Sequence, residues 1–205
     1  EEDEIIFGCG CFWGAEKCFW KLPGVITTSV GYAGGKKNNP TYYEVCSGLT
    51  GHSEVVRVIW DKREIDVSDL LKMFWECHDP TQKNRQGNDM GTQYRSAIYY
   101  KNENNIKTIL ASKEQYQTEL SKKNLGLIET EIKMIDSYFY AEQYHQQYLA
   151  SAGSRQYCSA SPTKVKLGVF TGSNYKLEDH IWENFNWEVD KCVLRSDNNP
   201  IKNNI

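Results

Sequence analysis

The sequence has no long apolar run and no excess of basic charge. No stretch approaches the ~18 consecutive apolar residues of a membrane-spanning helix, so no such span is expected. Lys and Arg number 24 against 27 Asp and Glu, which gives a formal net charge of −3 at pH 7. Because nucleic-acid and anionic-membrane binders need a basic surface, neither partner is expected.

The chain also lacks a recognisable secretory signal and a disulfide framework. It begins EEDEIIFG, without a basic segment and apolar stretch, and without an initiator Met, so a removed targeting peptide stays open. Its seven Cys are an odd number, and secreted disulfide scaffolds are usually shorter and denser in Cys. We therefore expect a cytoplasmic protein, a monomer, with at least one working thiol.

Metal and triad motifs are missing as well. Structural zinc sites usually show Cys pairs two to four residues apart. Only Cys9-x-Cys11 and the neighbours Cys77 and His78 come near this spacing, so we expect no metal. A hydrolase with a cysteine nucleophile would need a His base. None of the four His stands in a motif that suggests one: His52, His78, His145 and His180.

The 205 residues, 40% of them hydrophobic, suffice for one domain with a core that needs no disulfides. Short strands of mostly alternating polarity alternate with helices, which favours a two-layer α+β sandwich over a doubly wound sheet. We expect strands at 4–9, 25–33, 53–61, 93–100 and 128–135, helices at 13–21, 66–77, 103–122 and 139–149, and a helical turn at 41–47. The pattern weakens after Gly153. A catalytic domain at 1–150 and a largely irregular C-terminal tail at 151–205 are therefore expected.

Cys11 lies in Gly-Cys-Phe-Trp-Gly, where a strand passes into a helix. The thiolate is the reactive form of cysteine, and a helix N-terminus favours negative charge. The flanking glycines allow a tight turn and close approach of a substrate. We therefore interpret Cys11 as a nucleophile rather than a small core residue. Phe12 and Trp13 follow directly, and two large aromatics there fit either an apolar wall for a methyl or thioether group or ordinary core packing.

Three further motifs offer polar groups at element boundaries. PTYYEVCSG places Tyr42 after a loop, GHSEVV places Glu54 at a strand start, and GNDMGTQYR contributes Asp89 and Tyr94. A site that removes an oxygen needs a proton donor and hydroxyl donors, and these residue types supply both. Each motif alone is a weak indication.

Taken in order, these motifs resemble the peptide methionine sulfoxide reductase A family. The resemblance rests on GCFWGAE, GYAGG, NPTYYEVCSGLTGHSEVV and HDPTQKNRQGNDMGTQYRSAIY, and it covers roughly residues 4–158. It implies an α+β fold with a ferredoxin-like two-layer core. It also implies reduction of methionine-S-sulfoxide, free or in proteins, with no bound cofactor and with thioredoxin as reductant.

The resemblance also implies roles for single residues. Cys11 matches the nucleophile, Phe12 and Trp13 the pocket for the S-methyl group, Glu54 the acid that protonates the sulfoxide oxygen, Tyr42 and Tyr94 the hydroxyls that hold this oxygen, and Asp89 a polar partner. Tyr32 in GYAGG is expected to be structural. A carboxylic acid donates at neutral pH only if its pKa is raised, so we predict that Glu54 is buried and protonated.

The resemblance assigns a resolving thiol to Cys158, in Gly-Ser-Arg-Gln-Tyr-Cys-Ser. The sequence departs from the commonest family pattern after this point, because it continues for over forty residues instead of a short glycine-rich stretch. Cys192 is either a second resolving thiol or a buried structural cysteine. The remaining cysteines are expected in the core: Cys9, Cys18, Cys46 and Cys77. Two rival functions stay open, a cysteine-nucleophile acyl-transfer hydrolase and a non-catalytic module that binds oxidised methionine.

Overall fold

The computed structural model describes residues 1–204 and shows an α+β fold built on a six-stranded mixed sheet. The strand order is β7-β6-β1-β3-β2-β8, and every neighbouring pair is antiparallel except β6 and β7. These strands are β1 (Glu2–Gly8), β2 (Val25–Ala33), β3 (Ser53–Asp61), β6 (Ala97–Tyr100), β7 (Glu131–Met134) and β8 (Tyr138–Tyr140). A small hairpin pairs β4 (Arg85–Gln86) with β5 (Asp89–Met90).

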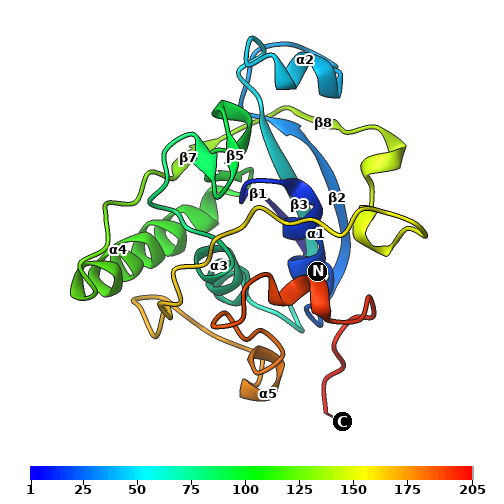
Figure 1. Ribbon diagram of the computed structural model, residues 1–205. Helices are drawn as coiled ribbons and strands as arrows, with labels where there is room; N and C mark the ends of the chain where they lie inside the picture. Colours follow the sequence, from blue (N-terminus) through cyan, green and yellow to red (C-terminus); the bar gives the residue numbers. More distant parts are fainter. Residues whose placement is uncertain (205) are drawn as a thin grey trace.

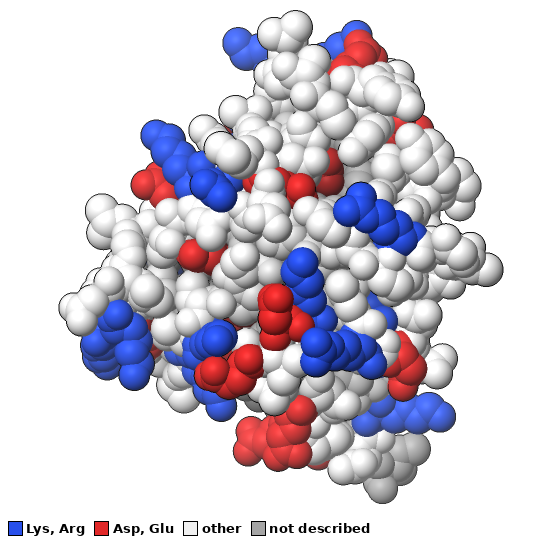
Figure 2. Space-filling view, viewed as in Figure 1, with Lys and Arg blue, Asp and Glu red and all other residues white. Residues whose placement is uncertain are grey.

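The helices are α1 (Phe12–Trp20), α2 (Tyr42–Cys46), α3 (Val67–Glu76), α4 (Ile106–Lys122) and α5 (Asp179–Trp182). Figure 1 shows α1, α3 and α4 grouped beside the sheet. None of the helices within residues 1–204 has the length and apolar character needed to cross a bilayer. Figure 2 shows acidic and basic side chains interspersed over the visible face, without a broad field of one sign.

The main core lies between the sheet and the helices. Alternating side chains of a strand point to opposite faces, so Phe7 faces the helices and Ile6 belongs to a separate cluster. The Phe7 ring stacks between Phe19 of α1 and Phe74 of α3, with centroids 4.9 and 5.0 Å away. This packing fixes α1, and therefore its first residues, against the end of β1.

Residues 138–140 correct one prediction. The expected helix at 139–149 is wrong, because Tyr138–Tyr140 form β8 and pair with Gly31–Ala33 of β2. Aromatic side chains favour strands, and the pairing covers an edge of β2 that would otherwise be open. Two 3-10 turns follow, at Gln143–His145 and Tyr148–Ala150.

The C-terminal segment packs against the rest of the chain. Seven of its side chains belong to the main core cluster: Cys158, Leu167, Phe170, Leu177, Ile181, Phe185 and Val193. Near the end, the Ile201 N–H donates to the Lys21 carbonyl at 2.8 Å. In Figure 1 this orange-to-red segment passes below α3 and α1.

Candidate active site

One pocket of about 280 Å³ brings together seven of the predicted site residues. They come from β3, β5, the first residues of α1 and α2, and the 3-10 turn Thr92–Tyr94: Cys11, Phe12, Trp13, Tyr42, Glu54, Asp89 and Tyr94. Arg155 and Tyr157 complete the lining, and the sequence analysis did not single them out. Cys158 and Cys192 line a different cavity.

Cys11 occupies the N-cap of α1, as the sequence predicts. The preceding Gly10 has φ +85°, a left-handed conformation that favours glycine, and it turns the chain from β1 into the helix. The Cys11 N–H donates to Ser159 Oγ at 3.2 Å. Burial, followed by proximity to the Glu54 carboxyl, raises the pKa of the Cys11 thiol well above its usual range. Burial therefore opposes ionisation of the resting thiol, against the expectation from its place at the helix N-terminus.

Glu54 lies at the start of β3 and is 1% exposed. Burial raises its pKa to about 8, although two hydrogen bonds oppose the shift. Gln93 Nε2 donates to Oε2 at 3.0 Å, and the Phe12 N–H donates to Oε1 at 3.3 Å. The prediction that Glu54 is buried is confirmed; its protonation at neutral pH stays a prediction, which the raised pKa favours. The Phe12 contact also ties this carboxyl to the residue that follows Cys11.

The aromatic wall is rigidly held. Trp13 stacks on Tyr148 with ring centroids 3.8 Å apart, and its Nε1–H donates to His145 Nδ1 at 3.0 Å. The Phe12 side chain is fully buried. Tyr32 is structural, as predicted, since its hydroxyl donates to Glu142 at 2.9 Å. Phe12 and Trp13 thus give the pocket an apolar side whose tryptophan ring is fixed by its own contacts.

Three tyrosine hydroxyl donors belong to the lining of the same pocket: Tyr42, Tyr94 and Tyr157. Burial raises the pKa values of Tyr42 and Tyr94, so both keep their protons at any physiological pH. Tyr157 donates its hydroxyl hydrogen to Asp89 Oδ1 at 2.8 Å, and burial raises its pKa to about 12. The pocket therefore combines a thiol, a neutral carboxyl and protonated phenols, a set able to protonate and hold an oxygen atom.

Sequence reasoning missed four residues that support the site: Gln93, Arg155, Tyr157 and Ser159. Gln93 and Tyr157 directly precede two residues that were singled out, Tyr94 and Cys158. Their burial and hydrogen bonds depend on the tertiary structure, and no spacing rule signals them. Among the described residues that line the pocket there is no histidine, so the base required by an acyl-transfer hydrolase is not supported.

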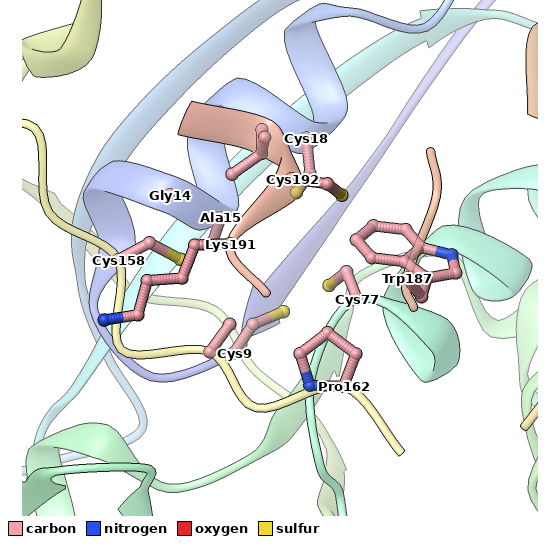
Figure 3. Close-up of a pocket in the computed structure, with 12 residues that line it drawn as sticks. Cys9, Gly14, Ala15, Cys18, Cys77, Cys158, Pro162, Trp187, Lys191 and Cys192 are labelled. Carbon is pink, nitrogen blue, oxygen red and sulfur yellow. The ribbon is translucent and has the colours of Figure 1, made fainter. Parts of the chain in front are cut away.

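Five of the seven cysteines line a second cavity of only about 10 Å³ (Figure 3): Cys9, Cys18, Cys77, Cys158 and Cys192. The Cys158 sulfur lies directly over Gly14 of α1, where an added Cβ would clash with Sγ. Burial raises the pKa of Cys158 to about 12 and that of Cys192 to about 11. Both thiols are therefore protonated at rest.

Cys9, Cys18 and Cys77 are buried, as expected. Cys46 is not: it is exposed on α2, and its sulfur accepts a 3.4 Å hydrogen bond from Gln93 Nε2. The reason is that α2 spans only Tyr42–Cys46 and buries Val45 alone.

One group of potential metal ligands stands among residues 1–204. Ligand atoms of Cys9, Cys77 and His78 lie within 4.8 Å of one another. Both His78 nitrogens already have partners, since Nδ1 lies 2.6 Å from the Phe74 carbonyl and Nε2 lies 2.8 Å from Ser96 Oγ. His78 thus has the contacts of a core histidine whose two ring nitrogens are both hydrogen-bonded.

A buried cysteine and a buried carboxyl of raised pKa in one aromatic pocket indicate a thiol enzyme. Comparison with known proteins specifies which kind. The peptide methionine sulfoxide reductase family matches residues 3–175, and the chain belongs to this family.

Named relatives agree. Peptide methionine sulfoxide reductase MsrA of Vibrio vulnificus is 56% identical over 164 residues, 80% of this chain and 78% of that protein. Methionine sulfoxide reductase A of Corynebacterium diphtheriae shares 43% identity, with a TM-score of 0.68 over 78% of this chain and 82% of that one. Mxr1 from Saccharomyces cerevisiae in reduced form shares 34%, with a TM-score of 0.71 over 78% and 90%.

Proposed function

We propose that this enzyme reduces methionine-S-sulfoxide, free or in proteins, to methionine, and so repairs oxidised proteins. The observation that carries the proposal is the Glu54 carboxyl, which is buried next to the first turn of the Cys11 helix, where burial raises its pKa to about 8. A sulfoxide oxygen leaves poorly unless it is protonated, and Glu54 holds the needed proton at neutral pH.

The chemistry uses the pocket as follows. Phe12 and Trp13 take the S-methyl group, and the Cys11 sulfur attacks the sulfoxide sulfur. Glu54 gives its proton to the oxygen, and the proton that Cys11 loses replaces it. The products are methionine and a Cys11 sulfenic acid, so the oxygen passes to Cys11 and the step balances without an added proton.

The polar groups of the pocket act on the oxygen that leaves the substrate. The hydroxyls of Tyr42 and Tyr94 donate to this oxygen while negative charge builds on it. Both hydroxyls keep their protons because burial raises their pKa values. Asp89 is a polar partner at the same end of the pocket.

Cys158 then resolves the sulfenic acid, which releases water and forms a Cys11–Cys158 disulfide. The next residue, Ser159, already accepts a hydrogen bond from the Cys11 N–H, so the segment is anchored beside its target. Cys192 shares the cavity of Cys158 and attacks this disulfide, which frees Cys11. A thioredoxin dithiol reduces the resulting Cys158–Cys192 bond by exchange.

The topology of the core, the division into domains and the cellular location belong to the same proposal. Four strands are antiparallel in the order β6-β1-β3-β2. Along the chain, α1 lies between β1 and β2, and α3 lies between β3 and β6. This arrangement supports a ferredoxin-like two-layer core. Residues 1–150 form the catalytic domain, and 151–205 form a C-terminal tail that carries Cys158 and Cys192; Ile205 itself lies outside the described residues. The reducing chemistry fits a cytoplasmic location.

The test is methionine formation from L-methionine-S-sulfoxide with dithiothreitol as reductant, with the R epimer as the control substrate. We expect turnover of the S epimer only. Hydrolysis of a thioester without sulfoxide reduction would instead establish the acyl-transfer alternative. Stoichiometric binding of the sulfoxide without consumption of dithiothreitol would establish a binding module.

A further inference from the structure

Arg155 is a cation of the pocket wall that the steps above leave unused. Its guanidinium carbon lies 4.6 Å from the ring centre of Tyr157. A planar cation over an aromatic face is attracted to it, so the guanidinium has a preferred place at the pocket. The same ring is anchored by the hydrogen bond to Asp89, which fixes the platform below the guanidinium.

A second cation lies near the ring that carries this guanidinium. Lys191 Nζ lies 5.7 Å from the centre of the same Tyr157 ring. Within residues 1–204, neither Arg155 nor Lys191 forms an ion pair with a carboxylate. Glu54 is neutral at pH 7, which leaves Asp89, already engaged by Tyr157, as the carboxylate of the pocket. The Arg155 guanidinium is therefore available to pair with an anionic group of a bound substrate.

The orientation of the substrate decides which anion reaches Arg155. The methyl group of the sulfoxide enters beside Phe12, which is buried, whereas the Arg155 side chain is exposed. The backbone end of methionine sulfoxide must therefore point outward, toward the rim where the guanidinium lies. Groups attached to or next to the α-carbon are the ones that it can contact.

We propose that Arg155 forms a subsite for a carboxylate next to the sulfoxide side chain. The carboxylate is either the α-carboxylate of free or C-terminal methionine sulfoxide, or the side chain of an adjacent Asp or Glu. This inference rests on the proposed function, because the pocket must first accept the sulfoxide. Exposed ion pairs are weak, so the expected gain in kcat/KM is about two- to fivefold at low salt, and it shrinks as salt is added.

The experiment compares kcat/KM for matched substrates with dithiothreitol as reductant, so that thioredoxin does not enter. The α-carboxylate is tested with N-acetyl-methionine-S-sulfoxide against its amide. The neighbouring side chain is tested with N-acetyl-Asp-methionine-S-sulfoxide amide against the Asn analogue. We expect the wild type to prefer the carboxylate in one pair or both, and the pair that responds identifies the source.

Arg155→Gln should bring the responding ratio to about one, because the charge is removed. Lys166→Gln is the matched control, since Lys166 is an exposed cation that lies outside the pocket lining. It should leave the ratio as in the wild type. A wild type without preference in either pair, or a ratio that persists in Arg155→Gln, would overturn the subsite. Failure of the proposed function would look different, because even the neutral amides would not be reduced.

Discussion

Replacing Glu54 with Gln tests the acid and its environment together. The carboxamide matches the carboxyl in shape but has no proton to release, so sulfoxide reduction should fall by roughly 10²–10⁴. In the wild type, activity should decline as pH rises through about 8, where Glu54 loses its proton. Initial rates of methionine formation, measured from pH 6 to 9.5 with dithiothreitol in excess, report both effects.

The same substitution should change the pH dependence of stability. Glu54 has a folded-state pKa of about 8 against a reference of 4.5, so it stays protonated in the fold while the unfolded chain ionises. Its contribution to stability is thus fully present below pH 4.5 and is lost as pH rises toward 8. At about 1.4 kcal/mol per pKa unit, the loss reaches about 5 kcal/mol as an upper bound. Glu54→Gln lacks this loss.

Urea unfolding between pH 5 and 8.5, in the presence of a phosphine reductant, measures the difference. The wild type should lose free energy of unfolding relative to Glu54→Gln as pH rises, and the two should become parallel above pH 8. Parallel curves over the whole range would refute the raised pKa. A near-normal reduction rate in the variant would remove Glu54 from the acid role even if the stability curves diverged.

Three further substitutions test the thiols and the support of the acid. Cys11→Ser should abolish reduction of methionine-S-sulfoxide, and appreciable residual turnover would contradict its role as nucleophile. Cys158→Ser should retain one turnover per enzyme in a single-turnover assay but block thioredoxin-driven cycling; repeated thioredoxin-driven turnovers would shift the resolving role elsewhere. Gln93→Met removes the N–H donor that lowers the pKa of Glu54, so this pKa should rise. Hydrogen bonds to charged groups contribute ~1.5–3 kcal/mol, so the alkaline limit of activity should move up by about one pH unit or more. An unchanged pH profile would mean that Gln93 does not act on the acid.

The sequence predicted the strands of the sheet better than the elements that surround it. Val25–Ala33 and Ser53–Asp61 have the bounds expected from their composition and polarity. Such strands are specified locally, because β-favouring residues there coincide with turn formers at both ends. The strand at Tyr138–Tyr140 was not predicted, because the residues that follow continue a spacing that also fits a helix. Only the open edge of β2 decides in favour of a strand, and that edge is a tertiary feature.

In the site, too, features set by the local sequence were predicted better than features set by the tertiary structure. Cys11 and Glu54 converge because each stands near the end of a rigid element: Cys11 is the N-cap of α1, and Glu54 is the second residue of β3. Quantities that depend on burial were less predictable. Cys46 looked like a core residue and is exposed, whereas Cys11 looked ready to ionise although burial raises the pKa of its thiol. Gln93 carries no chemical signal in the sequence, although it holds the acid.

Burial of both reacting groups couples the nucleophile to the acid. The negative charge of an ionised Glu54 opposes a thiolate nearby and is one cause of the raised pKa of Cys11. Raising the pH above 8 therefore removes the proton donor and also makes the thiol harder to ionise. The gain in thiolate that an exposed cysteine would show in alkaline solution cannot compensate here. The enzyme should consequently have an alkaline limit set by Glu54 and no second rise in activity near the ordinary pKa of a thiol.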